Sequence, residues 1–386
     1  MNYDFIIIGA GLTGCVIARE LAETGKNILV LERRIHIGGN MYDFINEDGI
    51  LVHKYGPHCF HTKNKTLIEY ICKYSEWKDF YIKCGAEIDG KYTPTPFNFQ
   101  TIDDFYSKEE AEKIKNAIKE EYPNQEFATV LELLNHKNKE IKKFATFLFE
   151  KDYSLYTAKQ WGISPSEIDP SVLKRVPIRF SYNEGYFDDE YQKLPVKSYL
   201  SFFESLVNHP NIEIVCNTDM KERLSFNFDE KKIFYQNTLF DGKLIYTGPI
   251  DELMNYKYGK LPYRSLRFEW KTEMINSFQK YPLVAYPQAI GYTRITEYTK
   301  LPEQKVGNKT TYAIEYPLLY NAEEKNEPYY PVLTEDSKKL LELYKNEISK
   351  YSNIICCGRL GDFQYYNMDQ ALERAIHIAK QICNQI

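Results

Sequence analysis

This sequence predicts an α/β fold that carries two further parts, a helical insertion and an antiparallel sheet. Three observations predict it. A glycine-rich motif lies between an apolar strand and a helix near the start, a lysine- and glutamate-rich helical stretch fills part of the middle, and tyrosine-rich stretches with alternating polarity occupy much of the second half. With 386 residues, the chain is long enough for two or three domains.

The composition is that of a globular protein. Hydrophobic residues make up 43% and charged residues 27%, which excludes disordered and collagen-like classes. A net charge of -5 gives no sign of a nucleic-acid partner. The first apolar run, Phe5 to Ile8, is too short for a signal peptide or a membrane span, so we expect no membrane span and a cytoplasmic location. The eight cysteines form no CxxC pair and predict buried free thiols.

The first elements follow one another in an informative order. The apolar strand ends at a GxGxxG motif, Gly9 to Gly14, and apolar residues then recur at helical spacing. A second apolar strand, Asn27 to Leu31, ends in Glu32. This order of strand, glycines, helix, strand and acid predicts a Rossmann-like site for a dinucleotide.

Each residue type in this motif has a physical task. Gly9 permits the tight turn, Gly11 lets backbone amides approach a pyrophosphate, and Gly14 lets the helix pack closely on the strand. The pyrophosphate is expected at the helix N-terminus, where unpaired N–H groups and the helix dipole favour negative charge. Glu32 is expected to accept hydrogen bonds from the adenosine ribose.

Two further segments indicate FAD rather than NAD. The residues after Glu32 include a Gly-Gly pair, Gly38 and Gly39, and resemble the flavin family that includes the amine oxidases. Near the end of the chain, a buried strand, a Gly-Arg pair and an amphipathic helix starting at Asp369 resemble the way that this class completes its FAD site; Asp369 also fits an ordinary helix N-cap. The expected cofactor-binding residues are Gly9, Gly11, Leu12, Thr13, Gly14, Glu32, Arg33, Gly39, Asn40, His58, Arg359, Met368 and Asp369.

The rest of the chain divides into parts that differ in composition and in hydrophobic periodicity. Residues from about Asp103 to Phe149 have helical periodicity and lie in the expected helical insertion at 98–165. The stretches from Val172 to Tyr191 and from Arg264 to Pro331 alternate with period two and predict a sheet over the flavin. The expected domains are a discontinuous FAD-binding domain at 1–78, 193–258 and 345–386, the helical insertion, and an antiparallel-sheet substrate domain at 79–97, 166–192 and 259–344.

Several motifs rich in Tyr, Arg and Pro recur in order over nearly the whole chain. They are His53 to Thr62, Tyr156 to Gly162, Lys174 to Phe180, Tyr246 to Asp251, Tyr263 to Leu266, Tyr292 to Ile295, Pro328 to Pro331 and Gly358 to Leu360. Together these motifs resemble the bacterial UDP-galactopyranose mutase family.

The resemblance implies an isomerase that uses FAD in its reduced state, without net oxidation or reduction. Such an enzyme interconverts UDP-galactopyranose and UDP-galactofuranose through a covalent adduct between the reduced flavin and the sugar. It also implies an external reductant, a homodimer and a role in cell-surface polysaccharide biosynthesis.

The resemblance further implies roles for single residues. Fixed guanidinium groups suit the leaving diphosphate, although an isolated arginine more often forms a salt bridge. Trp161 corresponds to the residue on which the base stacks. Asn98 corresponds to a residue of the sugar pocket, although an Asn at this position also fits a plain turn. The expected catalytic residues are Arg175, Arg294, His58 and His61, and the expected substrate-binding residues are Tyr156, Thr157, Trp161, Tyr186, Arg264, Tyr330, Tyr365, Asn367 and Asn98.

A metal site is the alternative interpretation of three histidines in one of these motifs. The spacing of His53, His58 and His61 could reach one ion, but no cluster of carboxylates or cysteines lies nearby in the sequence. We therefore expect no metal.

Two departures from the family pattern leave the substrate open. Asn367 stands where the family has an aspartate, and Ala285-Tyr286 replaces an Asn-Tyr pair with a one-residue deletion. UDP-galactose is the default, with UDP-N-acetylgalactosamine or a dTDP-6-deoxyhexose such as dTDP-fucose as alternatives. A flavin oxidase or dehydrogenase and a non-catalytic nucleotide-binding module are the rival functions.

Overall fold

The predicted parallel sheet is present in the computed structural model, which describes residues 3–161, 177–227, 229–324 and 326–384. Its strand order is β12-β2-β1-β16-β22, and every neighbouring pair is parallel. The order reverses between β1 and β16, which creates a crevice at the carboxyl ends of these strands. The strands are β1 (Phe5–Ile8), β2 (Ile28–Leu31), β12 (Ile212–Val215), β16 (Lys243–Tyr246) and β22 (Ile354–Cys356).

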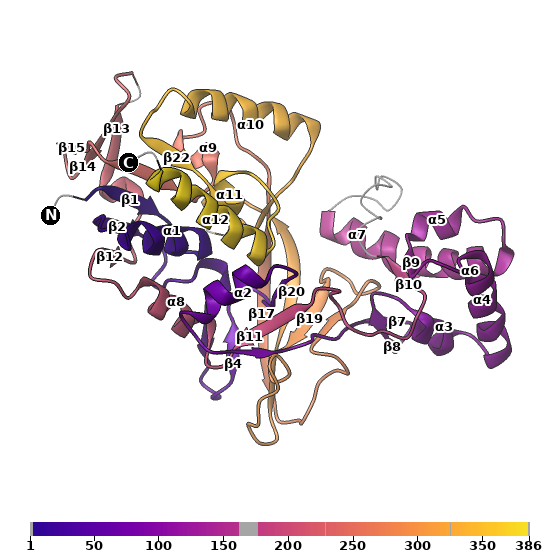
Figure 1. Cartoon of the computed structure of the whole chain (residues 1–386). Helices are drawn as coiled ribbons and strands as arrows, with labels where there is room; N and C mark the ends of the chain where they lie inside the picture. The colour runs from indigo at the N-terminus through magenta and orange to yellow at the C-terminus, as the bar shows by residue number, and fades with distance from the viewer. Residues whose placement is uncertain (1–2, 162–176, 228, 325, 385–386) are drawn as a thin grey trace.

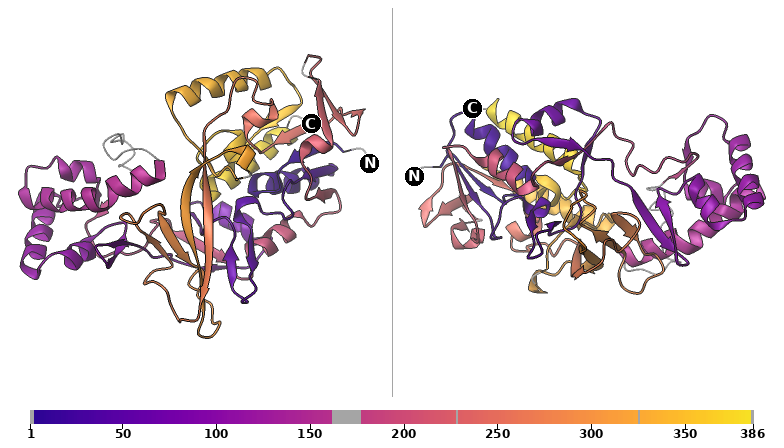
Figure 2. Two further views of the ribbon diagram at one scale, coloured as in Figure 1. Left: turned by 180° about the vertical axis from the view of Figure 1, so that it is seen from behind. Right: turned by 90° about the horizontal axis from the view of Figure 1, so that it is seen from below.

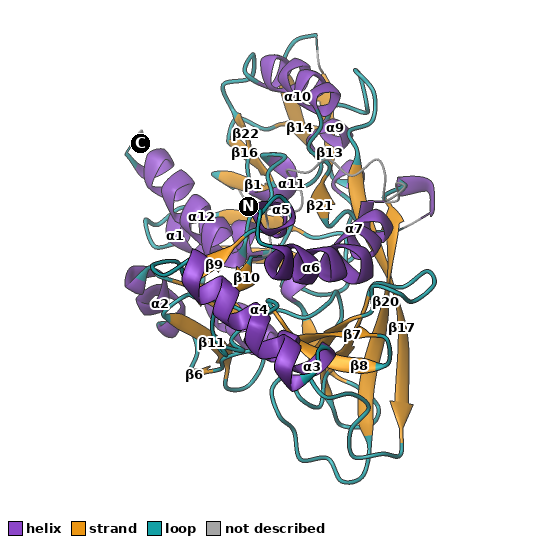
Figure 3. Cartoon of the chain, turned by 90° about the vertical axis from the view of Figure 1, so that its right-hand side faces the viewer, coloured by secondary structure: helices purple, strands orange, loops and turns teal. Residues whose placement is uncertain are grey.

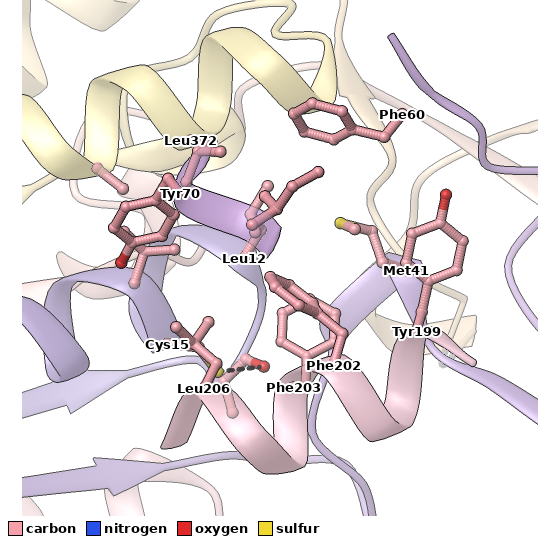
Figure 4. Close-up of a cluster of buried hydrophobic side chains, with 14 of the residues drawn as sticks. Leu12, Cys15, Met41, Phe60, Tyr70, Tyr199, Phe202, Phe203, Leu206 and Leu372 are labelled. Carbon is pink, nitrogen blue, oxygen red and sulfur yellow. Dashed lines mark hydrogen bonds between the residues drawn. The ribbon is translucent and has the colours of Figure 1, made fainter. Parts of the chain in front are cut away.

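Helices cover one face of this sheet. Alternate residues of β1 and β2, such as Ile7 and Val30, are buried in one apolar cluster with side chains of these helices. Figure 4 shows Leu206 of α8 beside Cys15 of α1, whose thiol donates a hydrogen bond to the Ala10 carbonyl at 3.2 Å. The helices are α1 (Leu12–Ala22), α2 (Lys65–Cys72), α8 (Tyr199–Val207) and α12 (Met368–Cys383).

The opposite face of the sheet packs against a second apolar cluster. Its members include Ile6 and Leu29 of the sheet and Leu341 and Tyr344 of α10. Figure 3 accordingly shows α10 and α12 on opposite sides of β16 and β22. The elements on this face are α9 (Ile250–Leu253), α10 (Glu335–Ile348) and the antiparallel strands β13 (Leu224–Asn227), β14 (Lys232–Tyr235) and β15 (Thr238–Leu239).

Helix α10 bears on one expected domain boundary. Residue 345, where we expected the FAD-binding domain to resume, falls within this helix. Because the buried side chains of α10 lie in the cluster beneath the parallel sheet, we propose that this domain resumes at residue 335.

A seven-stranded sheet stands beside the parallel sheet, in the order β21-β17-β20-β19-β18-β7-β8. Its pairings are antiparallel, as expected, except for the parallel pair β18–β7. The strands are β7 (Cys84–Ile88), β8 (Lys91–Thr95), β17 (Tyr263–Glu273), β18 (Leu283–Ala285), β19 (Arg294–Glu297), β20 (Thr310–Leu319) and β21 (Tyr330–Pro331).

The helical insertion forms a lobe on the far side of the seven-stranded sheet, and two opposite views agree on this (Figures 1 and 2). It has an apolar core of its own, in which Ile114, Leu133 and Phe144 are fully buried. Its elements are α3 (Phe99–Phe105), α4 (Lys108–Glu121), α5 (Val130–Leu134), α6 (Lys139–Leu148), a π-helical turn at Phe149–Tyr153, α7 (Ser154–Trp161) and the short strands β9 (Phe127–Ala128) and β10 (Ile178–Arg179).

The segment from Val172 to Tyr191, expected to add strands to the sheet, has a different structure where it is described. Between residues 177 and 190 the one strand is β10, and it pairs with β9 of the helical insertion. Side-chain hydrogen bonds hold this segment as a loop: Arg179 binds the Gly185 carbonyl and the Asp188 carboxylate, the latter at 2.6 Å. The polar run that follows Phe180 offers no apolar face for a sheet.

Short strands connect the parts. Two of them form a hairpin after the glycine-rich turn, and three others form a small sheet in the order β5-β11-β6. They are β3 (Asp43–Ile45), β4 (Leu51–His53), β5 (Phe60–Thr62), β6 (Trp77–Asp79) and β11 (Tyr191–Pro195), and a short helix α11 (Gly358–Gly361) follows β22.

Two further expectations concern membranes and cysteines. No helix among the described residues is both long enough and apolar enough to cross a bilayer. All eight cysteines lie in the described ranges as free thiols; Cys15, Cys59, Cys84 and Cys357 are buried as predicted, whereas Cys72 is exposed.

The contact between α1 and β1 gives a stability prediction. A Cβ atom on Gly14 would lie 2.0 Å from the Gly9 carbonyl oxygen, so Gly14→Ala forces the helix away from the strand. We expect this substitution to lower the free energy of unfolding by about 3 kcal/mol, measured by urea denaturation.

Gly11→Ala is the matched control for that measurement. A Cβ there would lie 3.7 Å from Gly39 Cα, in ordinary contact, and the Gly11 φ of -80° suits alanine. Its free energy of unfolding should change by less than about 1 kcal/mol. Equal losses in the two variants would contradict the close packing proposed for Gly14.

Candidate functional site

A cavity of about 830 Å³ lies in the crevice at the carboxyl ends of β1, β2 and β16. In sheets of this topology, this edge is where dinucleotides bind. The cavity brings together most of the expected cofactor residues: Gly9, Gly11, Leu12, Thr13, Glu32, Arg33, Gly39, Asn40, His58, Arg359 and Met368.

The glycine-rich turn forms the floor of the cavity. Gly11 is the N-cap of α1 and provides no side chain, so the first N–H groups of the helix are left for a bound acceptor. Gly39 approaches Gly11 so closely that a Cβ atom on Gly39 would lie 2.8 Å from Gly11 Cα. Because neither glycine carries a side chain, the helix N-terminus is accessible to an anion in the cavity.

Glu32 lies at the cavity wall but is also part of the backbone framework. Its carboxylate accepts the N–H of Ala10 at 2.7 Å and that of Arg34 at 2.8 Å. Each oxygen retains a second lone pair that could bind a ribose hydroxyl. Glu32 therefore shapes the glycine-rich turn, a role that the sequence did not reveal.

The C-terminal segment closes the cavity from the opposite side. Arg359 donates to the carbonyls of Tyr366, at 3.1 Å from Nε, and Tyr329, at 3.3 Å from Nη1. Helix α12 begins at Met368, with Asn367 as N-cap, one residue earlier than expected. Asp369 does not line the cavity, and its Oδ1 is buried without a hydrogen-bond partner among the described residues.

An ion-pair cluster joins the cofactor cavity to the loop before β21. Glu327 lies 2.8 Å from Arg34 Nη2 and 3.0 Å from Arg33 Nη2, and Arg34 also donates to Asn40 at 2.9 Å. The two guanidinium groups lower the pKa of the Glu327 carboxyl, against the opposing effect of burial. Arg33 thus lines the cavity as expected, but its charge is paired.

His58 lies between this cavity and a second group of polar side chains. It lines the cavity, and its Nδ1 lies 2.8 Å from the Gly56 carbonyl oxygen. Burial, together with the nearby charges of Arg359 and Arg294, lowers the pKa of His58 to about 4. The imidazole is therefore neutral at pH 7.

Arg294 is the centre of the second group. Its Nε donates to Glu315 Oε2 at 2.6 Å, and Glu315, which is fully buried, also accepts from the Thr296 hydroxyl at 3.0 Å. Burial opposes the charge of Arg294, but the Glu315 carboxylate raises its pKa above the ordinary value. The result is a rigid guanidinium whose terminal nitrogens carry further donors.

Expected tyrosines surround this arginine. Burial raises the pKa of Tyr156, Tyr186 and Tyr330, to about 12 for Tyr186, and the Arg294 charge counteracts this rise at each of them. Their hydroxyls stay protonated at neutral pH and can donate hydrogen bonds. Tyr365 belongs to the same group, because its ring lies 5.7 Å from that of Tyr330.

Helix α7 contributes two more expected residues, and β17 contributes one. Tyr156 and Thr157 lie on α7, and Arg264, buried on β17, donates to the Gln160 carbonyl at the end of that helix. Arg264 therefore supports the wall of the site. Arg175 and the side chain of Trp161 lie outside the described residues.

Two expected substrate-binding residues, Asn98 and Asn367, are helix N-caps. Asn98 is fully buried as the N-cap of α3: its Oδ1 accepts from Gln100 N–H at 2.8 Å, and its Nδ2 donates to the Asn183 carbonyl at 2.9 Å. In this structure Asn98 thus has a structural role, and its assignment to the sugar pocket stays a prediction. Asn367 is also a helix N-cap, although it adjoins the cavity-lining Met368.

His61 does not line the cavity either. Its Nδ1 lies 2.6 Å from Asp189 Oδ2, and its ring stacks on Phe187 at 3.6 Å between centroids. These contacts anchor the loop that carries Tyr186, and the catalytic role expected of His61 stays a prediction. Among the described residues, no group of three or more His, Cys, Asp or Glu side chains is arranged to hold a metal ion.

Some residues of the site were missed in the sequence. Glu315 and Lys159 are the clearest, and Glu315 had a signal: it is an acidic residue within an otherwise apolar stretch of β20. A charged residue at an inward position of a strand is expected to have a buried partner. Lys159 had no comparable signal, because its ligands are backbone carbonyls.

Comparison with known proteins agrees with this geometry. A family model described as "UDP-galactopyranose mutase" matches residues 151–365, and one described as "NAD(P)-binding Rossmann-like domain" matches residues 7–74. A crystal structure of reduced UDP-galactopyranose mutase aligns with a TM-score of 0.73, covering 100% of this chain and 95% of that one. At 16% identity, this likeness shows the fold.

Curated relatives cover the whole chain. The UDP-galactopyranose mutase of Mycoplasma genitalium is 35% identical over 99% of this chain and 95% of its own. The dTDP-fucopyranose mutase of Escherichia coli is 31% identical over 97% of each chain. On these matches, the chain belongs to the UDP-galactopyranose mutase family of flavin-dependent isomerases.

Proposed function

We propose that this protein interconverts UDP-galactopyranose and UDP-galactofuranose, with FAD as its cofactor and the reduced state as the active one. The observation that carries the proposal is His58, which lines the dinucleotide cavity and is near enough to Arg294 for that charge to lower its pKa. A dinucleotide in the cavity would thus lie next to a fixed guanidinium. This juxtaposition suits a reaction in which a nucleoside diphosphate departs beside a flavin.

The described residues fit FAD. The close approach of Gly11 and Gly39 forms a cradle in the cavity wall, and a Cβ atom on Gly39 would lie 2.8 Å from Gly11 Cα and fill it. Gly11, Leu12 and Thr13 would hold the pyrophosphate, Glu32 the ribose, and Arg359 and Met368 the opposite wall. When bound and reduced, the flavin supplies an electron-rich nitrogen that can displace a diphosphate from an anomeric carbon.

The task of Arg294 follows from the charge that the leaving group gains. Glu315 holds Nε, so the terminal nitrogens can bind diphosphate oxygens without a large loss of side-chain entropy. In a partly dry site, such fixed donors stabilise the developing negative charge more than mobile ones do. Arg175 is proposed as its partner, and Arg264 as a supporting residue.

Neutral groups around the arginine would complete the site. The protonated hydroxyls of Tyr156, Tyr186 and Tyr330 are proposed to donate to the diphosphate or the sugar, and Tyr365 is proposed to contact the same ligand. The base is proposed to stack on Trp161. Neutral His58 would contribute a donor or an acceptor near the flavin without adding charge.

A second substrate is supported by one specific observation. The E. coli dTDP-fucopyranose mutase is nearly as similar to this chain as the UDP-galactopyranose mutases are. Asn367, at the start of α12 beside the cavity, replaces the aspartate of the family pattern. Isomerisation of dTDP-fucose is therefore the second candidate reaction.

The family also supports a setting for this activity. We propose an external reductant for the flavin, a homodimer, a cytoplasmic location and a product used for cell-surface polysaccharide. We also propose that the chain is divided as expected: one domain binds FAD, the antiparallel-sheet domain binds the substrate, and the helical insertion is a separate part.

An assay with controlled flavin reduction tests the function. We expect the dithionite-treated protein to convert UDP-galactopyranose to the furanose form, separated by chromatography, and the air-oxidised protein to convert none. dTDP-fucose, UDP-N-acetylgalactosamine and UDP-galactose are compared in parallel. Steady oxygen uptake with substrate would instead identify an oxidase, and UDP binding without any furanose product would identify a binding module.

Arg294→Ala tests the diphosphate site. Turnover should fall about 10²- to 10³-fold or more, because the fixed donor to the leaving group is lost. Flavin absorbance of the purified protein should not change, because Arg294 does not line the cofactor cavity. The control is Arg267→Ala, an exposed arginine of the same sheet that stacks on Tyr316, and it should keep normal turnover. A normal rate for Arg294→Ala would contradict the assignment.

A further inference from the structure

Helix α7 is attached to the seven-stranded sheet by Lys159, whose hydrogen bonds within the described ranges go to three backbone carbonyls. Lys159 Nζ lies 2.5 Å from the carbonyl oxygen of Tyr286, 2.8 Å from that of Ala289 and 2.9 Å from that of Tyr292. An ammonium group has three donors, so these carbonyls occupy all of them. Lys159 therefore works as a bound cation at the centre of a loop.

That loop leads directly into Arg294. It connects β18, which ends at Ala285, with β19, which begins at Arg294. Its ends are joined by a hydrogen bond from the Tyr286 N–H to the Thr293 carbonyl at 2.8 Å. Without the lysine, the Ala289 and Tyr292 carbonyls would lose this donor, which is costly for a partly buried backbone, whereas the Tyr286 carbonyl would keep the Ala289 N–H at 3.2 Å. Lys159 thus fixes the loop just before the proposed diphosphate-binding residue.

The next residue of α7 is held by the same sheet. The Gln160 carbonyl accepts a hydrogen bond from Arg264 of β17. The rest of the helical insertion stands apart from the parallel sheet (Figures 1 and 2). The last turns of α7 are therefore where this lobe docks on the substrate side of the molecule.

Docking at this point determines where Tyr156 lies. Tyr156 precedes Lys159 by three residues, so the two side chains share one face of the helix. Helix α7 packs against β20, the strand whose Glu315 holds Arg294, and the Arg294 charge counteracts the effect of burial on the Tyr156 pKa. A shift of α7 on the sheet would move the Tyr156 hydroxyl away from the guanidinium.

We propose that Lys159 is a positioning residue, which fixes α7 on the β18–β19 loop and thereby sets Tyr156 against Arg294 in the nucleotide-sugar site. The inference rests on the proposed function in that it takes Arg294 as the diphosphate ligand. The charge state is consistent with it: burial lowers the pKa of Lys159 to about 8, while Asp152 opposes the shift, so the ammonium form prevails at pH 7.

Lys159→Met tests this role by ligand affinity. We expect the Kd for UDP, measured by calorimetry with the flavin-loaded protein, to rise about tenfold or more. The KM for the nucleotide sugar should rise in parallel, with a smaller change in kcat. Lys159→Arg, which keeps a cation with several donors, should restore part of the affinity. The matched control is Lys143→Met, whose ion pair with Glu110 at 2.9 Å lies within the helical insertion, and its Kd should equal that of wild type.

A double-mutant cycle separates positioning from a general structural role. If Lys159 acts by placing Tyr156, then Tyr156→Phe should weaken UDP binding clearly in the wild-type background but hardly at all in Lys159→Met. Additive losses, or a wild-type Kd for Lys159→Met, would overturn the proposal. Flavin content and thermal unfolding report whether each variant folds. If Lys159→Met does not fold, Lys159→Arg takes its place in the double-mutant cycle.

The outcome is distinguishable from failure of the proposed function. If the wild-type protein forms no furanose from any of the three nucleotide sugars, the proposed reaction is wrong. The UDP affinities and the cycle still decide whether Lys159 positions Tyr156, because they require no turnover.

Discussion

One buried ion pair constrains the substrate side of this molecule. Arg294 and Glu315 lie directly opposite each other on β19 and β20, so the register of these strands determines where the guanidinium lies. Glu315 is fully buried, and leaving such a carboxylate without its partner would cost several kcal/mol. The arginine is therefore not free to change its position with the ligand. A sheet that needs this pair for its own stability also holds a preformed anion-binding group.

The remaining parts of the fold converge on that group. The parallel sheet ends in a cavity that His58 lines, and His58 is in turn near Arg294. The helical insertion approaches from the other side through α7, and the loop before β21 is joined to the cofactor cavity by the pairing of Glu327 with Arg33 and Arg34. Three parts that are distant in sequence thus share one site. Movement of any of them would change the surroundings of the Arg294 guanidinium.

The sequence predicts those features that depend on local patterns. The strand, glycines and helix around Gly9 to Gly14 follow from residue-by-residue sterics, and a Cβ on Gly14 would indeed meet the Gly9 carbonyl. Features that depend on distant partners were not predictable. Asn98 has the same side chain whether it caps a helix or binds a sugar, and only its contacts with Gln100 and Asn183 distinguish the two. The loop around Gly185 and the pairing of Glu315 likewise arise from tertiary contacts that no periodicity reveals.

The central claim is that Arg294, held by Glu315, binds the diphosphate of a nucleotide sugar beside the flavin. A crystal structure of the reduced protein with UDP tests it most directly. We predict diphosphate oxygens within hydrogen-bond distance of the terminal nitrogens of Arg294, while Nε remains bonded to Glu315. UDP bound away from this arginine, or an Arg294 side chain that turns away from Glu315 to reach the ligand, would contradict the account.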